Sequence, residues 1–128
     1  IEQRKFNRID CEIGLVGRLA RYHNKPLINM GKQFSGTIKN ISAGGVLLQT
    51  NLDLPVDMII SFKLKLQYFL DCNAIVKRVS KIEEPSVYQI GCQFVDMQLD
   101  DIKTISIYVF KEQLKMKQKQ LKDDTIVK

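Results

Sequence analysis

Hydrophobic and polar residues alternate along most of the first hundred positions. Side chains of an extended chain point to opposite faces in turn, so an apolar residue at every second position marks a half-buried strand. The alternation predicts six strands, at residues 12–19, 34–40, 46–50, 60–66, 70–82 and 88–94. Because no helical segment separates them, this spacing is typical of an antiparallel sheet closed into a barrel.

The segments between the predicted strands carry turn-forming residues. A polar loop is predicted at residues 21–32, a break at 54–57 and a turn at 83–86, and each contains a proline. Residues 42–45, Ser-Ala-Gly-Gly, predict a turn or bulge, because glycine takes a positive φ without steric cost. Residues 1–9 lack an apolar period, so we expect them to form an extended, flexible arm.

The last thirty residues follow a different period. Apolar side chains recur at helical spacing, and Asp100 is a suitable N-cap. Acidic residues stand at the start of this segment and four lysines near its end, the order that a helix dipole favours. The predicted fold class is mainly β, a six-stranded antiparallel barrel with a C-terminal α-helix. We divide the chain into an arm (1–9), a barrel (10–98), a helix (99–122) and a tail (123–128).

Length and composition indicate a single soluble domain. The chain has 128 residues, of which 45% are hydrophobic and 27% charged, and no apolar run is long enough to span a bilayer. No secretory signal opens it, and we expect a cytoplasmic protein. It begins with Ile rather than Met, so we expect either a trimmed chain or one module of a longer protein. Cys11, Cys72 and Cys92 are an odd number, widely spaced, and each falls within a strand-like run. This favours buried free thiols over disulfides or a zinc site.

The net charge of +6 is concentrated at the two ends of the chain. Residues 1–39 hold eight Lys/Arg against three Asp/Glu, and residues 111–128 hold six against three. This excess of positive charge suits an anionic partner. Charge alone does not decide whether that partner is a nucleotide, a nucleic acid or a membrane surface. Catalysis is not indicated: His23 is the only histidine, in a polar loop, with no nucleophile grouping, metal spacing or phosphate loop around it. We therefore expect no enzyme, no metal and no cofactor.

Two short motifs carry the functional signal. Arg4 and Arg8 form an Arg-x-x-x-Arg at the start, and Asn40, Ser42 and Gly45 form an Asn-x-Ser-x-x-Gly between two predicted strands. In this order and spacing they resemble the PilZ domain, a small β-barrel that binds the bacterial second messenger cyclic di-GMP. The resemblance covers most of the chain, since residues 88–94 also look like the last barrel strand of that family.

The resemblance implies a ligand with two phosphates and two guanines. Arginine suits both, through charge-assisted contacts to phosphate and to the O6 and N7 acceptors of guanine. Asn40 and Ser42 can pair with a guanine edge. Gly44 and Gly45 would leave room for a base close to the backbone. Carried over from the family, the contacts are Arg4, Arg8, Asn40, Ser42 and Gly45.

Four further residues are weaker candidates for ligand contacts: Gln3, Lys5, Gly44 and Gln93. Lys5 is either a second phosphate contact or a surface charge. Gln93 either faces the ligand or is an exposed strand residue that makes no ligand contact. In the family, the residue before the first motif arginine influences whether one ligand or a stacked pair is held. Here it is the neutral Gln3, so we expect one ligand per chain.

The resemblance implies a receptor that switches a partner protein or a neighbouring domain when cyclic di-GMP binds. Family members act in motility, exopolysaccharide synthesis and pilus function. One alternative is a PilZ-like interaction module that has lost the ligand. Another is a basic barrel that binds single-stranded nucleic acid, but Phe34, Phe62, Tyr88 and Phe94 fall on the apolar phases and predict core instead. We expect no DNA partner and no membrane span.

Overall fold

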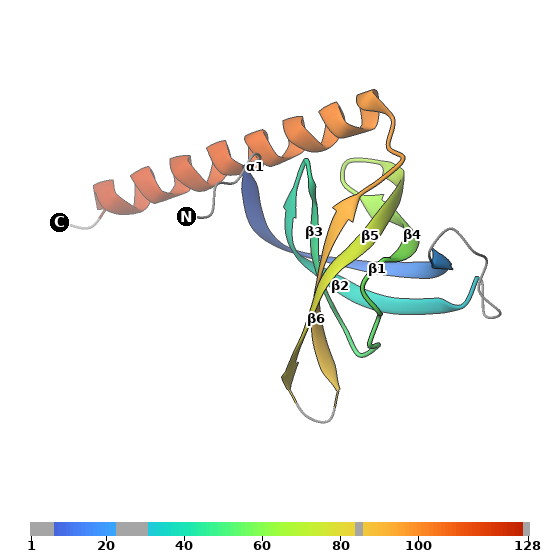
Figure 1. The fold of residues 1–128 in the computed structure, drawn as a ribbon. Coiled ribbons are helices and arrows are strands. Elements are labelled where there is room, and N and C mark those ends of the chain that lie inside the picture. The colour runs from blue at the N-terminus through green and yellow to red at the C-terminus, as the bar shows by residue number, and fades with distance from the viewer. Residues whose placement is uncertain (1–6, 23–30, 84–85, 127–128) are drawn as a thin grey trace, which may run out of the picture.

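The computed structural model describes residues 7–22, 31–83 and 86–126. Six antiparallel strands close into a barrel in the order β1-β2-β3-β6-β5-β4, as Figure 1 shows. The elements are β1 (Arg8–Tyr22), β2 (Gln33–Ser42), β3 (Gly45–Thr50), β4 (Met58–Lys65), β5 (Phe69–Glu83), β6 (Val87–Phe94) and α1 (Leu99–Ile126). The predicted fold class, a six-stranded antiparallel barrel with a C-terminal helix, is confirmed.

The barrel interior is filled by the apolar phase of each strand. The side chains of Ile38, Leu48, Ile60, Val76 and Ile90 come from five different strands, and each is 0% exposed. Such burial is the main favourable term in folding. Of the four aromatic residues predicted as core, three are buried and Tyr88 is half-buried.

Strand β1 begins earlier than the sequence predicted. Ile9 is buried in the core and pairs with Ile41 of β2, so the alternation starts at Ile9 rather than at position 12. The polar residues Asp10 and Glu12 are the outward positions of that same alternation. Arg8 and Ile9 therefore belong to the barrel, and the predicted flexible arm was wrong for these two residues. Residues 1–6 lie outside the described part of the chain.

Helix α1 starts where expected but runs further. The amides of Asp101 and Ile102 both donate to the carbonyl of Gln98, so Asp100 lies in the first turn and is not the N-cap. The helix continues to Ile126, past the predicted end at Lys122, because no glycine or proline follows to stop it. Most of the predicted tail is therefore helical, and the last turn holds no basic residue.

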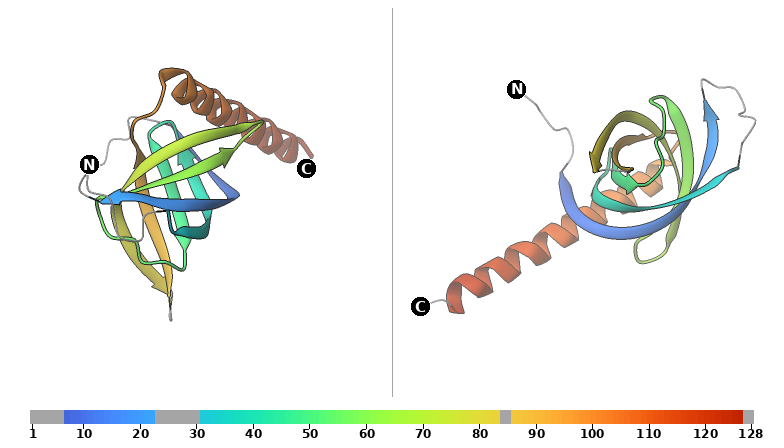
Figure 2. Two further views of the ribbon diagram at one scale, coloured as in Figure 1. Left: turned by 90° about the vertical axis from the view of Figure 1, so that its right-hand side faces the viewer. Right: turned by 90° about the horizontal axis from the view of Figure 1, so that it is seen from below.

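The two halves of α1 have different surroundings. Ile105 and Val109 join the barrel core, whereas the C-terminal half extends beyond the barrel in both Figure 1 and Figure 2. Ile107 and Phe110 of the N-terminal half and Leu114 and Met116 of the C-terminal half are exposed. Within the described residues, α1 is not apolar enough over a sufficient length to cross a membrane.

The three cysteines are free thiols, as predicted. Cys72 and Cys92 are buried, and burial raises the pKa of each thiol to about 12. Cys11 is only half-buried, contrary to the prediction, and donates to the carbonyl of Ile38 at 3.5 Å. Burial, and after it the charge of Asp10, raises the pKa of Cys11 to about 11. All three therefore stay protonated near neutral pH.

Candidate functional site

Strand pairing brings residues of the two motifs together. Arg8 on β1 lies opposite Ser42 on β2, and Gly45 on β3 lies opposite Gln93 on β6. These residues, with Asn40 and Gly44, line one open cleft of about 220 Å³ on the outer surface of the barrel. Six of the nine predicted site residues therefore meet at one place. The remaining three, Gln3, Arg4 and Lys5, lie outside the described residues, as does His23.

Asn40 and Ser42 are held by local hydrogen bonds. The Nδ2 of Asn40 donates to Oδ1 of Asp10 at 3.0 Å, and this contact ties the amide of Asn40 to β1. The Oγ of Ser42 accepts from the backbone amide of Gly44 at 3.1 Å, which fixes the turn between β2 and β3. The carbonyl oxygen of Asn40 and the hydroxyl hydrogen of Ser42 are then the groups that can serve a ligand.

Gly45 has a structural reason to be glycine. A Cβ at this position would lie 2.0 Å from the carbonyl oxygen of Cys92, because β3 approaches β6 closely there. The predicted turn at residues 42–45 is present, but neither of its glycines has a positive φ; among the described glycines only Gly31 does, at 88°. The expected reason, conformational freedom, was therefore wrong.

Six residues that line the cleft were not predicted as site residues, and they are Val46, Leu47, Lys77, Arg78, Gly91 and Cys92. Val76 pairs with Cys92 and Arg78 with Gly91, so Lys77 is an extra residue in β5, a β-bulge. Both Lys77 and Arg78 are exposed as a result. The available signal was two consecutive cations inside an alternating strand, where strict alternation would have turned one of them toward the core.

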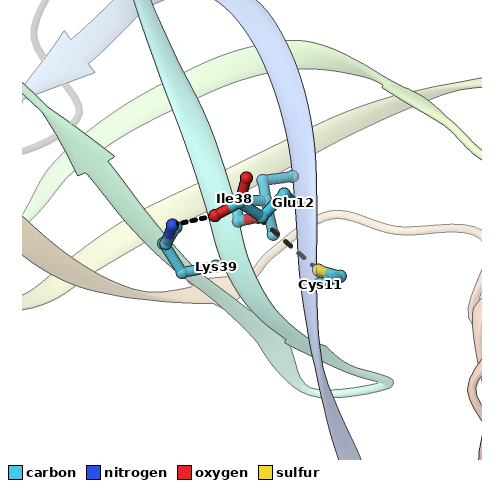
Figure 3. A network of polar contacts seen from close by, with 4 residues as sticks. All are labelled: Cys11, Glu12, Ile38 and Lys39. Carbon is cyan, nitrogen blue, oxygen red and sulfur yellow. Dashed lines mark hydrogen bonds and ion pairs between the residues drawn. The ribbon is translucent and has the colours of Figure 1, made fainter.

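The charged groups around the cleft are unequally paired. Figure 3 shows Lys39 on β2 in an ion pair with Glu12 on β1. The hydrogen bond from Lys39 lowers the pKa of the Glu12 carboxyl. In contrast, no carboxylate among the described residues forms an ion pair with Lys77 or Arg78. No group of three metal-ligating side chains occurs in the same part of the chain.

A second, larger hollow adjoins the cleft. It has a volume of about 1330 Å³ and lies between α1 and the start of β1, with Phe110, Leu114 and Lys117 on its helical side. Arg8 and Asn40 line both this groove and the cleft. Any group that binds Arg8 and Asn40 would therefore also change the surroundings of α1.

The sequence pattern that defines the PilZ domain matches residues 2–111, a stretch that includes both motifs. The chain belongs to the PilZ domain family. PilZ domains are non-catalytic modules, and this agrees with the expectation that the domain is not an enzyme.

Solved structures share this fold. The complex of K. pneumonia MrkH with c-di-GMP has a TM-score of 0.71 at 25% identity, covering 93% of this chain and 56% of MrkH. YcgR of Escherichia coli in complex with c-di-GMP has a TM-score of 0.72 at 13% identity, and the match covers 95% of this chain and 51% of YcgR. The Bacillus subtilis inhibitor of motility (MotI/DgrA) has a TM-score of 0.68 at 16% identity. The match covers 90% of this chain and 53% of MotI/DgrA.

This chain thus spans about half the length of those three proteins. It covers 98% of the separately solved PilZ domain of YcgR, at 11% identity and a TM-score of 0.67. At identities below 25%, the likeness to YcgR and MotI/DgrA concerns the fold alone. No curated protein sequence matches the chain.

Proposed function

We propose that this chain is a receptor domain for cyclic di-GMP. The observation that carries the proposal is the cleft in which Arg8, Asn40 and Ser42 meet. These residues come from two motifs about thirty positions apart, and the pairing of β1 with β2 unites them. The likeness to MrkH, solved as a complex with c-di-GMP, supports the same ligand.

The chemistry of the cleft suits a guanine dinucleotide. Arg8, with Arg4 on the preceding segment, supplies guanidinium donors for phosphate oxygens and for guanine O6 and N7. The carbonyl oxygen of Asn40 accepts from guanine amino or imino groups, and Ser42 can donate or accept. We assign Gly45 to the cleft through its backbone, since its missing side chain is explained by the contact of β3 with β6.

The domain acts as a switch in this proposal. Cyclic di-GMP orders residues 1–7 over the cleft, and the changed surface acts on a partner protein or a neighbouring domain. The groove that shares Arg8 and Asn40 with the cleft gives the ligand a route to α1. Control of motility, exopolysaccharide synthesis or pili is the expected output, in the cytoplasm of a bacterium.

One observation favours the nucleic-acid alternative. Tyr68 and Phe69 are 56% and 62% exposed at the turn between β4 and β5. The Nζ of Lys65 lies 6.0 Å from the centre of the Phe69 ring, and Lys63 is nearby. Single strands bind to aromatic platforms in basic grooves. However, two aromatics at one turn offer a shorter platform than a row along the strands, and Lys63 is already paired with Asp71.

Calorimetry with cyclic di-GMP, GTP and a single-stranded oligonucleotide separates these functions. We expect cyclic di-GMP to bind in the micromolar range or tighter and GTP far more weakly, because a mononucleotide has too few groups to engage both motifs. Equal binding of GTP, or no binding of cyclic di-GMP, would contradict the proposal. Tight oligonucleotide binding that depends on Phe69 would favour the alternative.

A further inference from the structure

The bulge in β5 changes which side chains reach the cleft. In a regular strand Lys77 and Arg78 would point to opposite faces, and one cation would enter the barrel interior. The extra residue, Lys77, breaks that alternation, so two consecutive cationic side chains are both exposed and both line the cleft. Bulges are frequent beside functional sites, where they redirect side chains.

Gly91 directs Arg78 toward the cleft. A Cβ on Gly91 would lie 2.9 Å from both Cγ and Nε of Arg78, so the Arg78 side chain occupies the space above this glycine. Strand β6 separates β5 from β3 in the barrel. An arginine of β5 that lies over Gly91 of β6 therefore extends toward Leu47 of β3, which pairs with Gly91. Leu47, Gly45 and Gln93 line the same cleft.

Within the described part of the chain, no carboxylate balances the charges of Lys77 and Arg78. No ion pair joins Lys77 or Arg78 to a carboxylate within residues 7–22, 31–83 and 86–126. Arg8 adds a third cation on the other side of the cleft. Neighbouring like charges repel one another, and an anion bound between them relieves that repulsion.

We propose that Lys77 and Arg78 form a second cationic wall of the cleft, opposite Arg8, and that Arg78 contacts a phosphate or guanine acceptor of the bound cyclic dinucleotide. The inference rests on the proposed function and extends it to residues outside both motifs. Gly91 is the positioning residue, because its missing side chain lets Arg78 lie flat on the wall. Lys77 adds a point charge.

The test is calorimetric titration of the whole chain with cyclic di-GMP. We expect Arg78→Ala to weaken binding about tenfold or more, the loss of a charge-assisted contact, and Lys77→Ala to weaken it less. Arg18→Ala is the matched control, since Arg18 is an exposed arginine of β1 that lines a different hollow. It should bind as the parent chain does. Thermal unfolding checks that each variant is folded.

A double-mutant cycle tests the role of Gly91. Gly91→Ala should weaken binding in the parent chain but have little further effect in the Arg78→Ala background, because it acts through the displaced arginine. Additive losses would contradict this positioning role. If Arg8→Ala loses affinity while Arg78→Ala binds like the parent, the second wall is wrong and the proposed function stands. If the parent chain binds no cyclic di-GMP, both fail.

Discussion

Arg8 lies at the first position of β1, where the segment bearing Arg4 joins the barrel. Its backbone is fixed by pairing with Ser42. The sheet thus presents one motif arginine to the other motif before any ligand arrives, and this lowers the ordering cost of binding. Lys5 lies outside the described residues.

Replacement of Arg8 should therefore cost more than replacement of Lys5. Each hydrogen bond to a charged group contributes about 1.5–3 kcal/mol, and Arg8 can make several, whereas Lys5 offers one point charge. Calorimetry on Arg8→Ala and Lys5→Ala measures the difference, and thermal unfolding should show that the barrel stays folded in both variants. Arg18→Ala controls for the loss of one positive charge. If Arg8→Ala binds cyclic di-GMP as well as the parent chain does, Arg8 does not contact the ligand.

Gly45 makes a separate prediction at the residue scale. In Gly45→Ala the new Cβ would meet the carbonyl oxygen of Cys92 at 2.0 Å, so β3 and β6 must separate. Overpacking of this kind costs about 1–3 kcal/mol, and we expect a lower unfolding midpoint without any ligand. Gly14→Ala is the control, since nothing lies within 4 Å of a Cβ there. Equal unfolding midpoints for Gly45→Ala and Gly14→Ala would contradict this prediction, because they would show that β3 and β6 accommodate the new Cβ without loss of stability.

At the scale of elements, the alternation predicts which segments form strands but not where one residue is inserted. All six strands were found from the sequence, and their ends missed by a few residues. Ile9 was missed because Asp10 and Glu12 surround the start of β1 with charge. The exposure of both Lys77 and Arg78 was missed because a bulge inserts one residue and so changes which face of the strand the following side chains point to. The close approach at Gly45 depends on β3–β6 pairing, a long-range contact that local pattern does not contain.

The segment before β1 is expected to respond most to the ligand. It has no apolar face and carries adjacent like charges, so an anion should order it. Amide exchange across residues 3–7 should slow markedly when cyclic di-GMP is added. Strand β4 (Met58–Lys65) pairs with β1 and β5 away from the cleft and should change little. Full protection of residues 3–7 without ligand would leave the switch with no responding segment.

For the whole molecule, the excess of positive charge predicts how binding depends on salt. The chain carries a net charge of +6, but cyclic di-GMP has only two phosphates. Ion release on binding is therefore small, and affinity should fall only modestly as salt rises. A protein covering six to ten phosphates of DNA loses about 10³–10⁵ in affinity between 50 and 200 mM salt. Titrations over that salt range decide the matter, and a loss of that size would favour the nucleic-acid alternative.

Stoichiometry depends on how the cations of the whole cleft are shared. The residue before the first motif arginine is Gln3, which offers hydrogen bonds but no charge to the phosphates of a second ligand. Among the described residues, the cations that line the cleft are Arg8 on β1 and Lys77 with Arg78 on β5. Two cationic sides match the two phosphates of a single cyclic dinucleotide. We therefore expect one cyclic di-GMP per chain in titrations at protein concentrations well above the dissociation constant. Gln3→Arg, which restores a cation at that position, should move the break toward two ligands per chain. A break near two ligands per chain for the parent chain itself would contradict the argument from Gln3.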